Sequence, residues 1–347
     1  MPDSLHEIVG VIHIHSSYSD GTKAIEEIAR IGESAGLDFL MFSDHMTLQP
    51  LRDGHERFHN KIAVLIGYEI EDKNDENHFL AFGIEKELPA KIPATEYVSQ
   101  VHQQGGLGII AHPDEIRTAI FQYPAYPWNA WDAAGFDAIE IWNHMSAWLE
   151  HLKRFNVIKM IFHPRRDLRG PTSRVLKKWD ELSETKKVAG IGSADVHAHV
   201  YRRGPIRLTI FPYKVQFRSI RTHLLLNVPL SSEISQAKLQ ILDAIRSCRV
   251  FVSNYRWGDA RGFKFHAQGQ NKIAVMGDEI PNSNDLIFKI MAPFSAEIRI
   301  INNGATISVF SGDQIEFPIK EPGLYRVELY RNGKGWIYSN HIRITKG

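Results

Sequence analysis

Short apolar runs alternate with helical patterns along the first two thirds of the 347-residue chain. Between the first two runs, apolar residues recur with helical spacing from a capping Thr22 to a terminating Gly36. Further helices are expected over 93–105, within 143–187 and over 231–248. This alternation is typical of βα units, so the predicted fold class is α/β. The apolar runs predict strands at residues 8–14, 39–42, 63–70, 78–82, 107–111, 138–142, 188–191 and 250–253.

The pattern changes beyond Trp257, where short alternating strands are separated by turn sequences such as Asn332-Gly333. Such spacing is the signature of a small all-β, immunoglobulin-like sandwich of roughly 90 residues. We therefore predict two domains, an α/β domain over residues 1–255 and a sandwich over residues 256–347.

The composition excludes several classes of protein. A net charge of +1 gives no broad field for nucleic acid or an anionic membrane, so neither partner is expected. The single cysteine, Cys248, excludes an intrachain disulfide and a thiolate-rich zinc site. The start of the chain has no secretory pattern, and no apolar run approaches the ~20 residues that cross a bilayer. A cytoplasmic protein is expected, and the sequence does not indicate its oligomeric state.

Histidines and carboxylates gather where the predicted strands end. The first strand ends in His13-Ile14-His15, and alternate residues on a strand face the same side. Asp20 follows in a loop of small residues that could bring its carboxylate back to the pair. A single His-x-His is weak support for metal binding, because exposed or hydrogen-bonded histidines are commoner.

The recurrence of such endings strengthens the signal. Burying many ionisable groups without partners is costly, and bound metal ions would compensate for that cost. A β/α barrel also places its active site at the carboxyl ends of its strands. The later endings are Ser43-Asp44-His45, Gly67-Tyr68-Glu69, Ala111-His112-Pro113 and Asp195-Val196-His197, with His78 at the start of another run.

The stretch His13-Ile14-His15-Ser16-Ser17-Tyr18-Ser19-Asp20-Gly21 closely resembles the opening motif of the polymerase and histidinol phosphatase (PHP) domain family. The later endings resemble further motifs of this family in the right order, so the resemblance extends over residues 6–255. It implies a distorted (β/α)7 barrel with a site for two or three divalent metal ions. The β-rich tail is similar to that of the carbaryl-hydrolase-like branch.

The resemblance also implies the ligand set. Glu69 would bridge the first two ions, and Glu69, Asp195 and His197 are the candidate catalytic residues. Some family members have histidine in place of Asp20. The carboxylate of Asp20 favours weaker occupancy of the third metal site, or its occupation by manganese. Imidazoles and carboxylates without thiolates suit zinc, manganese or iron. The expected ligands are His13, His15, Glu69 and Asp195 for the first ion, Glu69, His78 and His112 for the second, and Asp20, His45 and His197 for the third.

Neighbouring polar residues have alternative interpretations. Glu71 lies on the same strand face as Glu69 and could be the ligand instead. Asp44 and Glu140 are expected to orient ligand imidazoles rather than bind metal.

Three further residues are candidates for binding substrate. Arg165 and Arg202 could clamp an anionic group, although charged pairs on loops are usually only solvated. Asn143 is a candidate for substrate binding, with a hydrogen-bonding role in its loop as the alternative.

The leading functional hypothesis is a metal-dependent hydrolase that releases phosphate from a small organic phosphate. Paired metal ions would lower the pKa of a bound water and neutralise charge in the transition state. One alternative is hydrolysis of a carbamate, amide or ester by the same cluster, which the tail resemblance motivates. A non-catalytic metal-binding module is a third reading, but no member of the ligand set is missing from the sequence.

Overall fold

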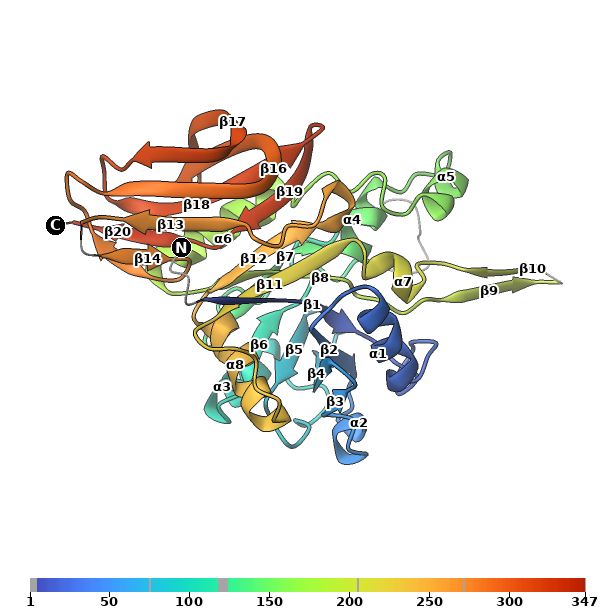
Figure 1. The fold of residues 1–347 in the computed structure, drawn as a ribbon. Helices are drawn as coiled ribbons and strands as arrows, with labels where there is room; N and C mark the ends of the chain where they lie inside the picture. Colours follow the sequence, from blue (N-terminus) through green and yellow to red (C-terminus); the bar gives the residue numbers. More distant parts are fainter. Residues whose placement is uncertain (1–4, 75, 118–123, 205, 271, 347) are drawn as a thin grey trace.

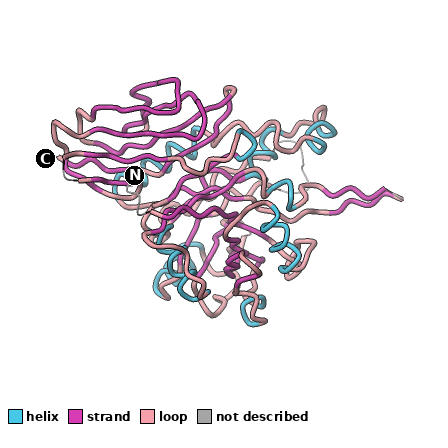
Figure 2. The backbone as a smooth tube through the Cα atoms, in the orientation of Figure 1, coloured by secondary structure: helices cyan, strands magenta, loops and turns pink. Residues whose placement is uncertain are grey.

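The computed structural model describes residues 5–346 apart from residues 75, 118–123, 205 and 271. Residues 1–4, part of the stretch without a secretory pattern, therefore lie outside the described residues. One large mixed sheet runs through the molecule and carries helices in its first part (Figure 1). Strands dominate the C-terminal part (Figure 2). The expected α/β class is confirmed.

Six strands of the first part run in the same direction, which brings their carboxyl ends to one side. β1 is parallel to β2, β2 to β4, β6 to β7 and β7 to β8. β5 runs antiparallel between β4 and β6, so β6 points the same way as β4. The strands are β1 (His6–Ile14), β2 (Phe39–His45), β3 (Phe58–His59), β4 (Ile62–Glu71), β5 (His78–Phe82), β6 (Leu107–Ile110), β7 (Ala138–Asn143), β8 (Ala189–Ser193), β9 (Val200–Arg203), β10 (Ile206–Thr209), β11 (Ile220–Leu226) and β12 (Val250–Asn254).

The expected distorted (β/α)7 barrel is not confirmed. The segment that follows β8 meets β1 through an isolated bridge, Ile14–Val196, and a hydrogen bond from the Ala194 amide to the Ile12 carbonyl at 3.0 Å. Within the described chain no ladder joins the two strands, and β1 pairs instead with β11 on that side. The antiparallel β5 also follows β4 through a short loop rather than a helix.

Eight α-helices occur within the described residues, and none is long and apolar enough to span a bilayer. α1 begins after Ala24, while the Thr22 hydroxyl donates to the Ala198 carbonyl, so the expected cap at Thr22 is wrong. Gly36 adopts φ 72°, a conformation that glycine tolerates best, and ends this helix as expected. The helices are α1 (Ile25–Ser34), α2 (Gln49–Arg52), α3 (Ala94–Gln103), α4 (His144–His151), α5 (Val157–Phe162), α6 (Ser173–Thr185), α7 (Tyr213–Gln216) and α8 (Ile234–Arg246).

The C-terminal strands enclose an apolar cluster that includes Phe265, Phe288, Ile298 and Trp336. The predicted β-rich tail is thus present, and the division at residues 255/256 stays a prediction. The 3-10 helix η1 (Tyr255–Trp257) leads into this part. Its strands are β13 (Lys264–Gln268), β14 (Ile273–Val275), β15 (Glu279–Pro281), β16 (Ile287–Asn302), β17 (Ala305–Pro318), β18 (Gly323–Arg331), β19 (Lys334–Ser339) and β20 (Ile342–Thr345).

The tail is joined to the first part through the sheet itself. β19 pairs with β12, with Phe251 opposite Ser339. The Asn340 side chain accepts from the Gly190 amide at 2.8 Å and donates to the Gly190 carbonyl at 2.8 Å. Because Gly190 lies on β8, the last strands of the chain support a strand that leads to Asp195.

Candidate metal centre

The strand ends converge on one cluster of histidines and carboxylates. Side chains from the ends of β1, β2, β4, β6 and β8 meet with one from the start of β5 and one from the loop after β1. Their ligand atoms form three groups, each within 4.8 Å, and one histidine belongs to two groups. The groups are His15, Asp20, His45 and His197; His13, His15 and Asp195; and Glu69, His78 and His112.

Glu69 lies at the middle of this cluster and is 1% exposed. Its two carboxylate oxygens lie close to five imidazoles, which is consistent with the expected bridging position. Glu71, the alternative ligand on the same strand, pairs with the Nδ1 atom of His45 at 2.7 Å and is partly exposed. The contacts of Glu69 are with His13 Nε2 at 3.1 Å, His15 Nε2 at 3.3 Å, His45 Nδ1 at 3.4 Å, His78 Nδ1 at 2.8 Å and His112 Nε2 at 3.4 Å.

The spacing of these atoms suits a shared cation. The Nε2 atoms of His13 and His15 both lie 3.5 Å from Asp195 Oδ1, and 3.1 and 3.3 Å from Glu69 Oε2. Zinc ligands at about 2.0–2.1 Å in tetrahedral geometry are separated by roughly 3.3 Å. In the described structure, neither ring nitrogen of the buried His15 has a hydrogen-bond partner, so the hydrogen-bonding capacity of this imidazole is unused. These residues therefore fit a metal ion.

The group around Asp20 is more open to solvent. Asp20 Oδ2 lies 3.2 Å from His197 Nε2, and Asp20 Oδ1 lies 3.8 Å from His45 Nε2. The Asp20 side chain is 48% exposed, whereas that of His197 is 8% exposed. A cation in this group would be the one that exchanges most readily with solvent.

The electrostatics of the cluster favour ionised carboxylates. Burial raises the pKa of Glu69, but the positive charges of His13 and His45 outweigh it and hold that pKa well below its usual range. Burial lowers the pKa of His15, but the Asp195 and Glu69 carboxylates beside it raise it to about 9. Imidazole binds a cation in its neutral form, so metal binding would release a proton from such a group.

Three candidate ligands have left-handed backbone conformations. The φ angles are 67° at His13, 27° at His112 and 53° at Asp195. Non-glycine residues rarely adopt such angles, and clusters of them are typical of functional sites. At His13 the strand also carries a bulge between Ile12 and Ile14. The convergence of His13 and His15 therefore depends on a local irregularity as well as on strand alternation.

Glu140 holds two candidate ligands in place, as expected. His13 Nδ1 donates to Glu140 at 2.7 Å, which leaves His13 Nε2 free of that proton and facing the cluster. Glu140 also accepts from the His112 backbone amide and from Asn143 Nδ2, both at 2.8 Å. Asp44 differs from the expectation, because it accepts from Ser16 and Ser19 and so anchors the loop that carries Asp20.

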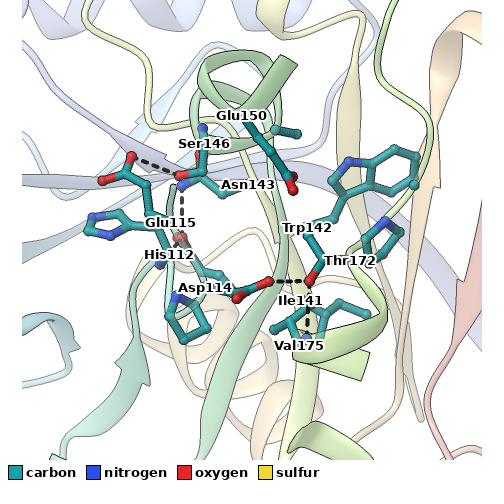
Figure 3. A pocket seen from close by; sticks show the side chains of 15 residues that line it. His112, Asp114, Glu115, Ile141, Trp142, Asn143, Ser146, Glu150, Thr172 and Val175 are labelled. Atoms are coloured by element: carbon teal, nitrogen blue, oxygen red, sulfur yellow. Dashed lines mark hydrogen bonds between the residues drawn. The ribbon is translucent and has the colours of Figure 1, made fainter. Parts of the chain in front are cut away.

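The candidates for substrate binding are placed in three different surroundings. Asn143 accepts from the Ser146 amide as the N-cap of α4 and lines a cavity with His112 and Glu150 (Figure 3). Arg165 Nη1 donates to the Arg218 carbonyl at 2.9 Å. Arg202 is exposed on a hairpin that projects from the body of the molecule (Figure 1). A role in substrate binding stays a prediction for all three.

One supporting residue had no signal in the sequence. The Tyr213 hydroxyl donates to the His15 carbonyl at 2.8 Å and accepts from the Thr22 amide at 3.3 Å. It thereby fixes the start of the loop that leads to Asp20. The partners are 198 residues apart, and Tyr213 stands in no motif that points to His15.

Replacing Glu140 with glutamine is expected to weaken metal binding by about 10- to 100-fold, because it removes the anionic partner of His13. Metal affinity, measured by competition with a chromophoric chelator, checks this. Glu150→Gln provides the control, since Glu150 lines the same cavity and its carboxylate pairs with Arg174. Equal metal affinity in the two variants would contradict the assigned role.

Comparison with known proteins agrees with the motifs. The family model of the PHP domain matches residues 12–161 of this chain. The search of curated proteins finds no match.

Solved structures give only distant similarity. A two-domain protein containing a predicted PHP-like metal-dependent phosphoesterase, from Bacteroides vulgatus, is 14% identical with a TM-score of 0.48. That similarity covers 98% of this chain and 96% of the other. An amidohydrolase from Chromobacterium violaceum, solved with sulfate and without metal, is 13% identical with a TM-score of 0.35, covering 59% of this chain and 92% of the other. Similarities at this level carry no conclusion about this chain.

Proposed function

We propose that this protein is a metal-dependent hydrolase that releases phosphate from a small organic phosphate ester. The observation that carries the proposal is the position of Glu69, a buried carboxylate within 3.4 Å of five imidazoles, with Asp195 Oδ1 3.5 Å from the Nε2 atoms of His13 and His15. The PHP domain supports the same class of chemistry.

The residues fit two or three divalent cations. His13, His15 and Asp195 would hold one with Glu69, and Glu69 with His78 and His112 a second, while Asp20, His45 and His197 would hold a third. Nitrogen and oxygen donors without sulfur suit zinc, manganese or iron. When bound, such cations supply Lewis acidity toward the phosphoryl oxygens and a water of lowered pKa.

The chain's own residues prepare the site for this chemistry. Glu140 fixes the tautomer of His13, and Asp44 holds the Ser16–Ser19 loop so that Asp20 reaches His197. The buried walls formed by β1 and β4 limit the access of bulk water. Glu69, Asp195 and His197 remain the proposed catalytic residues, because each faces the shared centre.

A second candidate function is hydrolysis of a carbamate, amide or ester. The described carboxylates of the cluster pair with histidines, and the exposed Arg202 lies on a projecting hairpin rather than among the ligands. A neutral substrate needs no guanidinium clamp. Under this alternative, replacing Arg165 and Arg202 should leave the rate of hydrolysis unchanged.

Metal removal gives the most direct test of the proposed function. We expect the purified protein to release phosphate from at least one member of a panel of phosphomonoesters and phosphodiesters, and chelation to abolish this activity. Addition of zinc, manganese or iron(II) should restore it. The same panel should include carbamates, amides and carboxylic esters. Protein with measured bound metal that cleaves no phosphoester would contradict the proposal.

A further inference from the structure

A second cavity is lined by three arginines and two aromatic residues. Its lining consists of Arg165, Arg218, Tyr255, Arg256 and Trp257. None of these residues belongs to the candidate ligand groups or to the cavity in Figure 3. The cavity is therefore lined by side chains that take no part in the candidate metal centre.

Three distant segments build this cavity. Arg165 lies in the loop between α5 and α6, Arg218 between α7 and β11, and the other lining residues form η1. Arg165 Nη1 donates to the Arg218 carbonyl at 2.9 Å, and the Tyr255 amide donates to the Ser219 carbonyl at 2.8 Å. These hydrogen bonds link the three segments to one another, so the fold sets the positions of the arginines.

The guanidinium groups lack compensating carboxylates. Among the described residues, no Asp or Glu oxygen lies within 4.0 Å of the side-chain nitrogens of Arg165, Arg218 or Arg256. Arginines elsewhere have such partners, as Arg52 has in Glu87 and Arg326 in Asp180.

The three cations also repel one another. Burial lowers the pKa of Arg165, and the charges of Arg256 and Arg218 lower it further. An anion between them would remove this repulsion.

The aromatic side of the cavity also favours an anionic ligand. Arg221 is buried beneath the Tyr255 ring, 3.7 Å from its centroid, and adds a further positive charge behind the ring.

We propose that this cavity binds a phosphate group, either free phosphate or the phosphate of a monoester. The planar guanidinium fork matches phosphate oxygens in a bidentate arrangement, and several such forks select a dianion over a monoanion. Arg256 is exposed and the other two arginines are partly buried, so the group enters from the side of Arg256.

Titration of the full-length protein with inorganic phosphate, followed by isothermal calorimetry, tests the proposal. Arg256→Met removes one exposed charge and keeps an apolar side chain, so folding should be retained; circular dichroism verifies this. We expect Arg256→Met to weaken phosphate binding by roughly tenfold and Arg256→Glu to weaken it further. Arg30→Met, an equal charge change on the exposed side of α1, should bind as the unmodified protein does. Phosphate affinity that is the same in both Arg256 variants as in the unmodified protein would overturn the proposal.

A kinetic comparison distinguishes the two sources of phosphate. If the cavity first captures the monoester that is later cleaved at the metal centre, Arg256→Met raises KM for that ester and leaves kcat unchanged. If it holds free phosphate, Arg256→Met leaves KM unchanged but still weakens the binding of inorganic phosphate measured by calorimetry. Absence of phosphoesterase activity would contradict the proposed function, yet the calorimetric comparison would still decide whether this cavity binds phosphate.

Discussion

Glutamine in place of Glu69 is expected to lower both bound metal and the rate of hydrolysis, the rate by roughly a hundred- to a thousandfold. The substitution keeps the shape of the side chain but removes the negative charge that five imidazoles surround. It also replaces one acceptor oxygen with an NH2 group, which cannot bind a cation. Elemental analysis of the purified variant and steady-state kinetics with the best substrate of the panel measure the two effects.

Glu71→Gln is the matched control for this experiment. Glu71 stands two residues further along β4, on the same strand face, and its carboxylate contacts only His45 among the cluster residues described. We expect this variant to keep its metal and to lose no more than about tenfold in rate. A larger loss from Glu71→Gln than from Glu69→Gln would show that the bridging position belongs to Glu71.

Replacement of Asp180 by alanine is expected to destabilise the protein by about 3–5 kcal/mol, because it leaves a buried guanidinium without its main partner. Asp180 on α6 accepts from Arg326 Nε at 2.8 Å and Nη2 at 2.9 Å, and pairs with His341 Nε2 at 2.8 Å. Equilibrium unfolding in urea measures the change. Glu181→Ala, which breaks only the exposed pairs with Lys177 and Lys178, should have an effect close to zero.

The effect of Asp180→Ala should depend on pH. Burial raises the pKa of Asp180, but hydrogen bonds from Arg326 and His341 outweigh it and hold that pKa below its usual range. A carboxyl with a lowered pKa stabilises the fold above its unfolded pKa and loses that contribution as the pH falls through its folded pKa. The difference in stability between the unmodified protein and the variant should therefore be full near neutral pH and shrink in acid. A difference that grows in acid would contradict this account.

Eight of the nine candidate ligands could be proposed from the sequence because each lies at the end of an apolar run or in the loop just beyond one, and the ninth, His78, begins such a run. Parallel strands bring their carboxyl ends together, so a motif at each end is enough to predict convergence. The bulge at His13 could not be predicted, since a left-handed residue there is stabilised by contacts with distant strands. Glu140 was expected to orient a ligand imidazole, but the sequence did not indicate that its partner would be His13, 127 residues away.

Strand β11 had no clear pattern either. Its sequence places Arg221, Thr222 and His223 among apolar residues, yet all three are buried. His223 pairs with Glu7 and Arg221 donates to the Ala35 carbonyl, across 216 and 186 residues. Polar residues with distant partners break the local alternation on which strand prediction depends.

The arginine cavity could not be predicted from the sequence either, because its three segments meet only in the folded chain.

The bond between Asn340 and Gly190 has a consequence for biosynthesis. Translation delivers the amino-terminal candidate ligands early, but β8 remains without this support until Asn340 has been synthesised. Cation binding by a nascent chain would consequently be incomplete, with the segment around Asp195 ordered last. A product that stops before Asn340 would therefore be expected to hold metal ions less firmly.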